Sequence, residues 1–557
     1  MPERSKGTSA ETDVGKFNVG CRDALQCVST KKYFENTKTI ALPITLPEIK
    51  IFRGDIRIMK RFTLMLIAIT ALSSTVFAGN GDYMSTQSAK FIMNTASVAR
   101  TEGADIVAYN PAGTAYLAPG LYFDVSNQML LRNYETKVKE SPNPDLINKK
   151  YEQSEPTYFM PNLYVVNNFG QQGPGKLAAF LQGGIIGGDG TMKWNGTVGS
   201  NALIENITLA LLNDSSMPFD SLSGNLIGSN PPSVASFSSS FETSSVYYAI
   251  GIGAAYTFFE DKASISLGIK YIMAKRTGKI NGVMNLATLP STGDTQVSFS
   301  IADEYEYDAN GFTPVIGIDA KPMEGLTLGL RFEMETSLEF KYKRKKIGAT
   351  PSSLGTANEF ENIANDSITP YLPDYKGMKA KQNLPSILSL GGEYVVMPEL
   401  TLGLAVTMFF APEVNYINYK YDPTATPPDD VTKSVKNTNG FGVGYEIALS
   451  GGYKIIDELK VGLGLMYTKQ GVKDSYLQDY NNLLATSTNP ILDSINIGLG
   501  ATYTIIENLD VTLAFNWELF FGNSLKVRDP DPAITEPYKF EYTKNIYGIY
   551  IGVGYRY

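Results

Sequence analysis

Histidine, the side chain that most often carries acid–base catalysis, is missing from this chain. Its 557 residues include no histidine, which excludes Ser-His-Asp and Cys-His nucleophiles, imidazole acid–base catalysis and histidine metal sites. The two cysteines, Cys21 and Cys27, lie upstream of the segment that we interpret below as a signal peptide, so the mature chain has no thiol. No coherent pair of carboxylates stands out. We therefore expect no enzyme, no catalytic residue, no metal and no cofactor.

The chemistry that remains is charge placed on one face of alternating segments. In 459–467 and 511–519 every second residue is apolar, and the residues between are mostly small or polar. The same parity puts six charged side chains on the face opposite the apolar one. If the apolar face meets lipid, a charge on it near mid-membrane would cost ~2–4 kcal/mol, so these charges must face a lumen. They are Lys270, Arg331, Glu333, Glu393, Glu446 and Arg556.

The last residues, 547–557, indicate which kind of element positions such charges. Apolar side chains alternate with glycine, tyrosine and arginine, and the chain ends on Tyr557 without a polar tail. A soluble sheet rarely leaves such an edge at its end, whereas the last strand of a transmembrane barrel pairs with the first. We expect outer-membrane lipid against the apolar face and the barrel assembly machinery as a partner of this strand.

One unit recurs along the chain: an alternating strand, a turn of two to five residues and a second alternating strand. Six copies plus one strand at each end give 14 strands. Short turns on one side and long, unequal loops on the other are typical of an outer-membrane barrel; a soluble sandwich or propeller is the alternative. The turns fall within 167–176, 255–265, 318–328, 393–402, 452–461 and 502–511, and the long loops at about 136–155, 189–243, 276–296, 343–383, 421–437, 472–490 and 523–540.

The segment 59–78 has the pattern of a signal peptide. A basic pair precedes an apolar run at 62–72, and a small-residue cleavage site ends at Ala78. The run is too short for a membrane-spanning helix, which needs about 20 residues. We interpret Met59 as the start of the protein and 1–58 as an upstream over-extension of the reading frame; a cytoplasmic extension on a signal anchor is the alternative. The expected location is the bacterial outer membrane.

The mature chain is acidic. Residues 1–78 hold 12 of the 48 basic and 7 of the 56 acidic side chains, so the remainder carries 36 and 49, a net charge of −13. An acidic chain without basic stripes is a poor partner for nucleic acid, and we expect none.

A barrel of this size needs something inside it. Fourteen strands at ~4.8 Å spacing and ~40° tilt close on a radius of roughly 14 Å, too wide for side chains alone to fill. Residues 79–119 precede the first strand and have no alternating run. We therefore expect an all-β fold, a 14-stranded antiparallel transmembrane barrel over 120–557, plugged by a small N-terminal hatch at 79–119; a periplasmic tail is the alternative for that segment.

The segment 102–117 resembles the hatch motif of the FadL/TodX family of outer-membrane long-chain fatty acid and hydrocarbon transporters. In that family an Asn-Pro-Ala triplet ends an N-terminal hatch inside a 14-stranded barrel. The matching residues here are Asn110, Pro111, Ala112 and Gly113. The resemblance extends over most of 79–557 and implies facilitated, energy-independent uptake of a hydrophobic ligand. The resemblance also implies an order of steps. Extracellular loops capture the ligand, the lumen binds it, the hatch rearranges, and the ligand leaves sideways through the wall at a kinked third strand.

The candidate third strand, 176–190, is rich in glycine, which weakens ladder pairing and permits a bulge. We predict a lateral gate there; room for the hatch to pack is the alternative explanation. The gate residues are Gly183, Gly184, Gly187, Gly188 and Gly190. In the loop that follows, Leu203, Ile207 and Leu211 recur at helical spacing and suit a capture site, although a helix folding down to cap the barrel would show the same pattern.

The resemblance also suggests a cargo, a long-chain fatty acid, whose carboxylate needs a cation. The lumen candidates are Lys270, Arg276 and Arg331; ion pairing with lumen glutamates is the alternative for each. An acidic lumen with few free cations would suit a neutral hydrocarbon better. Two other functions stay open: a surface adhesin or antigen, and a general diffusion porin, which steady single-channel current would distinguish from a hatch-closed barrel.

Overall fold

The computed structural model describes residues 87–142, 144–197, 201, 233–287, 297–351, 379–411, 415–417, 434–436, 440–479, 483–522, 524–528 and 535–557. The predicted upstream segment 1–58, the signal peptide 59–78 and the capture residues Leu203, Ile207 and Leu211 lie outside this set. Those interpretations stay predictions.

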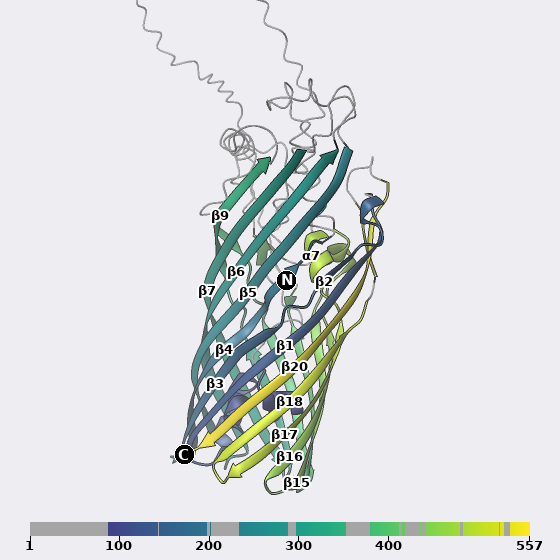
Figure 1. Cartoon of the computed structure of the whole chain (residues 1–557). Helices are drawn as coiled ribbons and strands as arrows, with labels where there is room; N and C mark the ends of the chain where they lie inside the picture. The colour runs from purple at the N-terminus through teal and green to yellow at the C-terminus, as the bar shows by residue number, and fades with distance from the viewer. Residues whose placement is uncertain are drawn as a thin grey trace, which may run out of the picture. The chain divides into compact units, whose positions relative to one another are not determined.

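Within the described residues, 14 strands form one antiparallel sheet that closes on itself (Figure 1). Each strand pairs with the next along the chain, and β20 pairs with β1 from Arg556 opposite Tyr122 to Lys539 opposite Glu140. The predicted 14-stranded antiparallel barrel is therefore confirmed. Its strands are β1 (Gly120–Glu140), β3 (Thr157–Gln172), β4 (Gly175–Trp194), β5 (Ser233–Phe258), β6 (Ala263–Ala287), β7 (Val297–Met323), β8 (Leu326–Glu333), β11 (Ile387–Met397), β12 (Leu400–Phe409), β15 (Gly444–Ile456), β16 (Leu459–Lys469), β17 (Ser494–Ile506), β18 (Leu509–Phe520) and β20 (Tyr538–Arg556).

Shorter elements extend the wall or lie inside it. The short strands are β2 (Lys150–Gln153) on β1, β9 (Glu339–Pro351) on β7, β10 (Lys379–Lys381) on β9, β19 (Ser524–Val527) on β20, and the separate pair β13 (Asn415–Ile417) and β14 (Ser434–Lys436). The helical elements are α2 (Ala89–Met93), η1 (Ser97–Ala99), η2 (Ala104–Ala108), η3 (Pro111–Tyr116), η4 (Pro144–Leu146), α6 (Asp474–Leu477) and α7 (Leu483–Thr488). Across the described part of the chain, none of these helices is long and apolar enough to span a bilayer.

All six predicted tight turns are present, between β3 and β4, β5 and β6, β7 and β8, β11 and β12, β15 and β16, and β17 and β18. The predicted loops 189–243 and 276–296 were too long, because β4 continues to Trp194, β5 begins at Ser233 and β6 continues to Ala287. Alternation persists in these extensions, but their outward residues, such as Lys275 and Lys279, are polar. These strand extensions therefore have the polar composition of a loop, which is why the sequence pattern did not predict them as strands.

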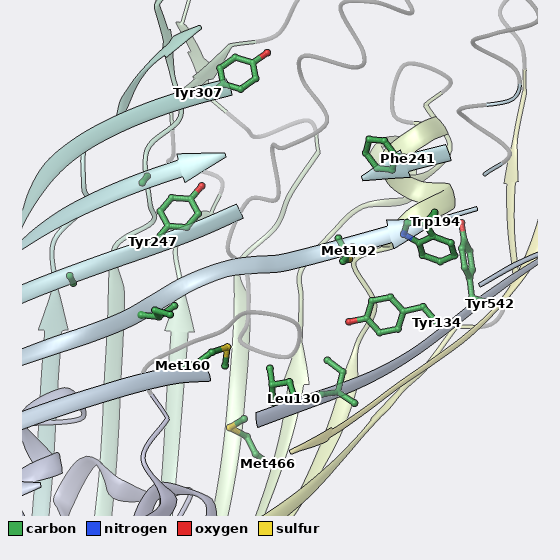
Figure 2. Packing of buried hydrophobic residues seen from close by; sticks show 14 of the residues in the cluster. Leu130, Tyr134, Met160, Met192, Trp194, Phe241, Tyr247, Tyr307, Met466 and Tyr542 are labelled. Atoms are coloured by element: carbon green, nitrogen blue, oxygen red, sulfur yellow. The ribbon is translucent and has the colours of Figure 1, made fainter. Parts of the chain in front are cut away.

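The wall has an apolar outer face and a mixed inner face. In β20 the outward Ile549 is 43% exposed and the inward Tyr550 is 1% exposed, as the alternation predicts. The inner faces of many strands converge on one buried cluster. Figure 2 shows Leu130 and Tyr134 of β1, Met192 and Trp194 of β4 and Tyr542 of β20 pointing into this common interior. The core of the molecule therefore occupies the lumen.

Residues 87–119, which we call the hatch, pack against the inner wall. The contact is close because the wall presents glycine there: a Cβ on Gly498 would lie 2.2 Å from the Ile92 carbonyl oxygen, and one on Gly462 would lie 2.5 Å from that of Met93. On the other side, a Cβ on Gly329 would lie 2.3 Å from the Val98 oxygen. Glycine on the lumen face thus gives the hatch its room.

Candidate functional site

The Asn-Pro-Ala-Gly segment joins the hatch to the barrel wall. Asn110 is fully buried; its Oδ1 accepts a hydrogen bond from the Ala112 backbone N–H at 3.2 Å and so begins η3. Its Nδ2 donates to the Val98 carbonyl at 2.9 Å and to Asp319 Oδ1 on β7 at 2.7 Å. Pro111 occupies the first position of η3, where no backbone donor is needed. One side chain therefore connects two parts of the hatch and one wall strand.

The rest of this segment is also packed tightly. The Ala112 carbonyl accepts a hydrogen bond from Ser264 Oγ of β6 at 3.0 Å. A Cβ on Gly113 would lie 2.6 Å from the Arg100 carbonyl oxygen, so no larger residue fits there. All four predicted motif residues thus lie together at the hatch–wall contact.

A buried ionic cluster holds the hatch together internally. Asp105 accepts from Ser88 Oγ and from Arg100 Nη2, each at 2.5 Å. Tyr109 stacks on Phe91 at 4.5 Å between ring centroids. Burial raises the pKa of the Tyr109 hydroxyl above its usual range, so this group stays protonated and neutral at physiological pH. A buried ion pair, a hydrogen bond and a ring stack thus connect the first helical turn of the hatch to its later part.

A cavity of about 190 Å³ lies between the hatch and the wall. The hatch contributes Phe91, Val98 and Tyr109 among others, and the wall adds both apolar side chains and polar or charged ones. The wall residues that matter here are Gln182 and Ile186 of β4, Tyr247 of β5, Lys270 and Ile272 of β6, Arg331 and Glu333 of β8, Met334, Leu384, Ile387, Phe409, Glu446 and Met466. A cavity that combines apolar side chains with polar groups is the usual form of a ligand site.

Two of the three predicted cations meet at this cavity. Lys270 Nζ lies 2.5 Å from Glu333 Oε1, and Arg331 Nη2 contacts the same carboxylate oxygen. All three side chains are at most 14% exposed. Glu333, which parity placed in the lumen, is thus shared by both cations.

The third predicted cation lies elsewhere. Arg276 is 3% exposed and does not line the cavity. Its guanidinium carbon lies 4.4 Å from the Phe340 ring centroid and 5.4 Å from that of Tyr247, and it donates hydrogen bonds to Gln382 and to the Tyr247 hydroxyl. This arginine packs in an aromatic cluster that the sequence did not predict.

The ladder between β3 and β4 ends at the glycine-rich part of β4. Pairing runs from Gln172–Gly175 to Leu163–Gly183, and beyond it the described residues 157–162 and 184–194 do not pair with each other. The β4–β5 ladder continues but shifts register between Ile185 and Gly187 and again between Gly187 and Gly190. Gly188 and Gly190 have positive φ, +104° and +65°. The five predicted gate glycines begin at the last paired position, Gly183, and continue beyond it. We call the stretch where 157–162 of β3 and 184–194 of β4 do not pair the β3–β4 gap.

The cavity and the hatch both reach this gap. Asn162 of β3 donates from Nδ2 to the Gln87 carbonyl at the start of the hatch, at 3.4 Å. A Cβ on Gly184 would lie 2.2 Å from Asn162 Oδ1. Arg132 of β1 donates to the Thr191 carbonyl of β4 at 3.3 Å. This contact lies past Thr157, the first residue of β3, which is opposite Leu130 of β1. Parity gives Arg132 and Asn162 an inward face, but only the structure shows that they border a gap.

The described residues contain no group of three or more His, Cys, Asp or Glu side chains that could hold a metal ion. A closed antiparallel barrel with an apolar outer face and an N-terminal segment packed inside it is the architecture of an outer-membrane barrel protein.

Comparison with known proteins gives the family. Residues 244–557 match the model of the outer membrane protein transport protein family (OMPP1/FadL/TodX), and the chain belongs to this family. It is an outer-membrane transport protein of the FadL/TodX family, located in the bacterial outer membrane, and that family transports hydrophobic compounds. No curated protein matches the chain significantly.

Solved structures share the fold at low sequence identity. A Pseudomonas aeruginosa FadL homologue is 13% identical with a TM-score of 0.54, and the alignment covers 86% of this chain and 99% of that one. The P. putida toluene transporter TodX is 10% identical at a TM-score of 0.49, and the Ralstonia pickettii toluene transporter TbuX 12% identical at 0.45, each with the same coverage. The first comparison supports the barrel fold.

Proposed function

We propose that this protein carries hydrophobic small molecules across the outer membrane by facilitated, energy-independent passage through the lumenal cavity, with lateral exit at the β3–β4 gap. The observation that carries the proposal is that the cavity and the gap share one strand. Gln182 and Ile186 of β4 line the cavity, and the pairing of β4 with β3 ends between them, at Gly183. Lateral release into lipid avoids exposing an apolar ligand to water, which would cost ~0.8 kcal/mol per CH₂.

Passage through this site requires the hatch to move. Phe91, Val98 and Tyr109 form one side of the cavity, and Gln87 is bonded to Asn162 at the gap. A ligand leaving the cavity must displace these contacts. The segment 110–113 is the joint about which we propose that the hatch rearranges. Capture by Leu203, Ile207 and Leu211 is the preceding step in this scheme.

Two cargo classes fit different features of the cavity. Lys270 and Arg331 in its wall are the kind of groups that the carboxylate of the expected long-chain fatty acid would need, although Glu333 already pairs with both. The volume favours a smaller molecule, since 190 Å³ is below the ~300–1,000 Å³ of typical ligand pockets and above the ~150 Å³ that hold benzene. We propose compact hydrocarbons as the first candidate and fatty acids, with part of the chain outside the cavity, as the second.

A disulfide across the gap tests the route. Residues 59–557 contain no cysteine, and a Cβ on Gly184 would lie 3.3 Å from the Asn162 Cα, so Asn162→Cys with Gly184→Cys can be oxidised to a staple. The variant would be expressed in a bacterium lacking its own outer-membrane fatty-acid transporter, and uptake of labelled toluene and labelled oleate followed. We expect uptake of toluene, the first candidate class, by the wild type, loss of most of that uptake on oxidation and its recovery on reduction.

A second pair provides the matched control. Thr502 and Thr512 face each other on β17 and β18 with their hydroxyl oxygens 2.9 Å apart, away from the gap. Oxidation of Thr502→Cys with Thr512→Cys should leave uptake unchanged. Unchanged uptake through the stapled gap would exclude lateral exit there. No uptake of either compound by a folded wild-type barrel would contradict transport and favour the adhesin.

A further inference from the structure

The ionisable groups lining the cavity balance one another. Lys270 and Arg331 are cations, and Glu333 and Glu446 are carboxylates, so the formal sum is zero. A cavity with this balance offers a charged ligand no net attraction. Which ligand it takes therefore depends on how the four groups are arranged.

The arrangement places one carboxylate between both cations. Arg331 and Glu333 are two residues apart on β8 and so face the same side of the wall. Lys270 comes from β6, on the other side of β7, and reaches Glu333 at 2.5 Å. Both cations thus contact the same oxygen, Oε1 of Glu333. The three side chains are almost entirely buried.

A ligand carboxylate entering this cavity meets a competitor that is already bonded. It would have to displace Glu333 from a cation and would leave that buried carboxylate unpaired, which is costly in a low-dielectric interior. A neutral ring or alkyl group requires none of these bonds to break and can pack on the apolar part of the lining, such as Phe91, Ile272 and Phe409. The same three residues therefore act against charged ligands and in favour of neutral ones.

We infer that Glu333 sets the ligand class of the cavity: by holding Lys270 and Arg331 it excludes carboxylates and reserves the site for neutral apolar molecules. This inference rests on the proposed function, since it names the cargo of the same cavity. Removing the carboxylate while keeping the side-chain shape should convert the cavity into a carboxylate site, because both cations then need a partner.

The test compares two probes that differ in one group. Toluene and benzoate share a ring of a size suited to the cavity, and benzoate is ionised at neutral pH. Their binding to purified protein in detergent would be measured by calorimetry for the wild type and for Glu333→Gln. We expect the wild type to bind toluene and to discriminate against benzoate. The variant should gain about tenfold or more in benzoate affinity, the effect of one charge-assisted hydrogen bond.

Two further variants guard against trivial outcomes. Glu518→Gln removes another buried lumen carboxylate that does not line the cavity, and it should leave the benzoate-to-toluene ratio unchanged. If Glu333→Gln fails to fold because two buried cations lose their partner, Lys270→Met with Glu333→Gln leaves only Arg331 and should still gain benzoate binding.

The outcomes separate the inference from the function beneath it. Toluene binding without any gain of benzoate affinity in a folded Glu333 variant would overturn the inference and leave transport standing. Equal wild-type affinity for the two probes would also overturn it. Failure of the wild type to bind either probe would overturn the proposed function and the inference together.

Discussion

At the scale of single residues, Asn110 ties the hatch to the barrel wall. Its side chain bonds the Val98 carbonyl, Asp319 and the Ala112 N–H, all of them buried. Asn110→Ala would remove these bonds and leave Asp319 buried without them. We expect the hatch to lose about 1–3 kcal/mol of local stability, the usual penalty for an unsatisfied buried polar group. Hydrogen exchange of residues 87–119 in the purified barrel measures this directly.

The control for that substitution is Asn508→Ala, since Asn508 is exposed in the turn between β17 and β18. It should leave exchange in the hatch unchanged. If Asn110→Ala also leaves it unchanged, the hatch is held by its packing alone and segment 110–113 is no joint.

Parity along a strand predicts which way a side chain faces but not what it meets. Lys270 and Arg331 were placed in the lumen from the alternation, and both line the cavity. Their common partner could not be chosen in advance, because it depends on the registers of β6, β7 and β8, which only the folded sheet fixes. Arg276 has the same parity, yet it packs on Phe340 because β9 brings that ring beside it. The motif at Asn110 was found from its own residue types, whereas its acceptor Asp319 was not.

At the scale of elements, the glycines of strand β4 differ in how much space surrounds them. Gly188 has φ +104°, and a Cβ there would lie 2.2 Å from the Ser245 carbonyl oxygen of β5. Gly188→Ala should therefore cost about 1–3 kcal/mol in strain and disturb the bulge beside the gap. We expect a lower urea midpoint for barrel unfolding, and slower cargo uptake in cells with equal amounts of folded barrel.

Gly183 is the matched control within the same strand. A Cβ at this position meets nothing within 4 Å, so Gly183→Ala should leave both the urea midpoint and uptake close to those of the wild type. If the two variants have the same urea midpoint and the same uptake, the positive φ of Gly188 is not needed for the bulge. That result would contradict the proposed role of β4 in ligand exit.

Strand assignment from sequence worked where the outer face meets lipid and failed above it. Within the lipid-facing region the outward residues are apolar, so β16, β18 and β20 show clean alternation and were predicted with their turns. Beyond it the outward residues meet water and become polar, which removes the contrast between faces. The ends of β5 and β6 therefore looked like loops, although their inward residues Phe241 and Ile280 are buried.

At the scale of the whole molecule, two groups of described residues that are distant in the chain lie against the inner face of the wall, the hatch and the α7 segment 483–493. The hatch packs on the inner wall near the end where Tyr122 pairs with Arg556. Towards the opposite end, α7 and the residues after it lie against the inner face of β1 and β20. There Thr136 Oγ1 donates to the Ser487 carbonyl at 3.1 Å, and Lys544 Nζ donates to Asn489 Oδ1 at 2.8 Å and to the Pro490 carbonyl at 2.9 Å. Figure 1 shows α7 near the far end of the barrel from the C-terminus.

We expect the hatch and the α7 segment to obstruct the lumen in series, and this predicts how the barrel conducts ions. A current must pass both, so removing one leaves the other as the limiting resistance. Deletion of 79–119 alone, or replacement of 483–493 by a short glycine-serine linker alone, should raise steady single-channel conductance in a planar bilayer only slightly. The double variant should conduct like an open barrel with a lumen radius set by its 14 strands. Large steady current through the intact protein would contradict the plugged lumen and favour a diffusion porin, and large current after the first deletion alone would show that the α7 segment does not close the barrel.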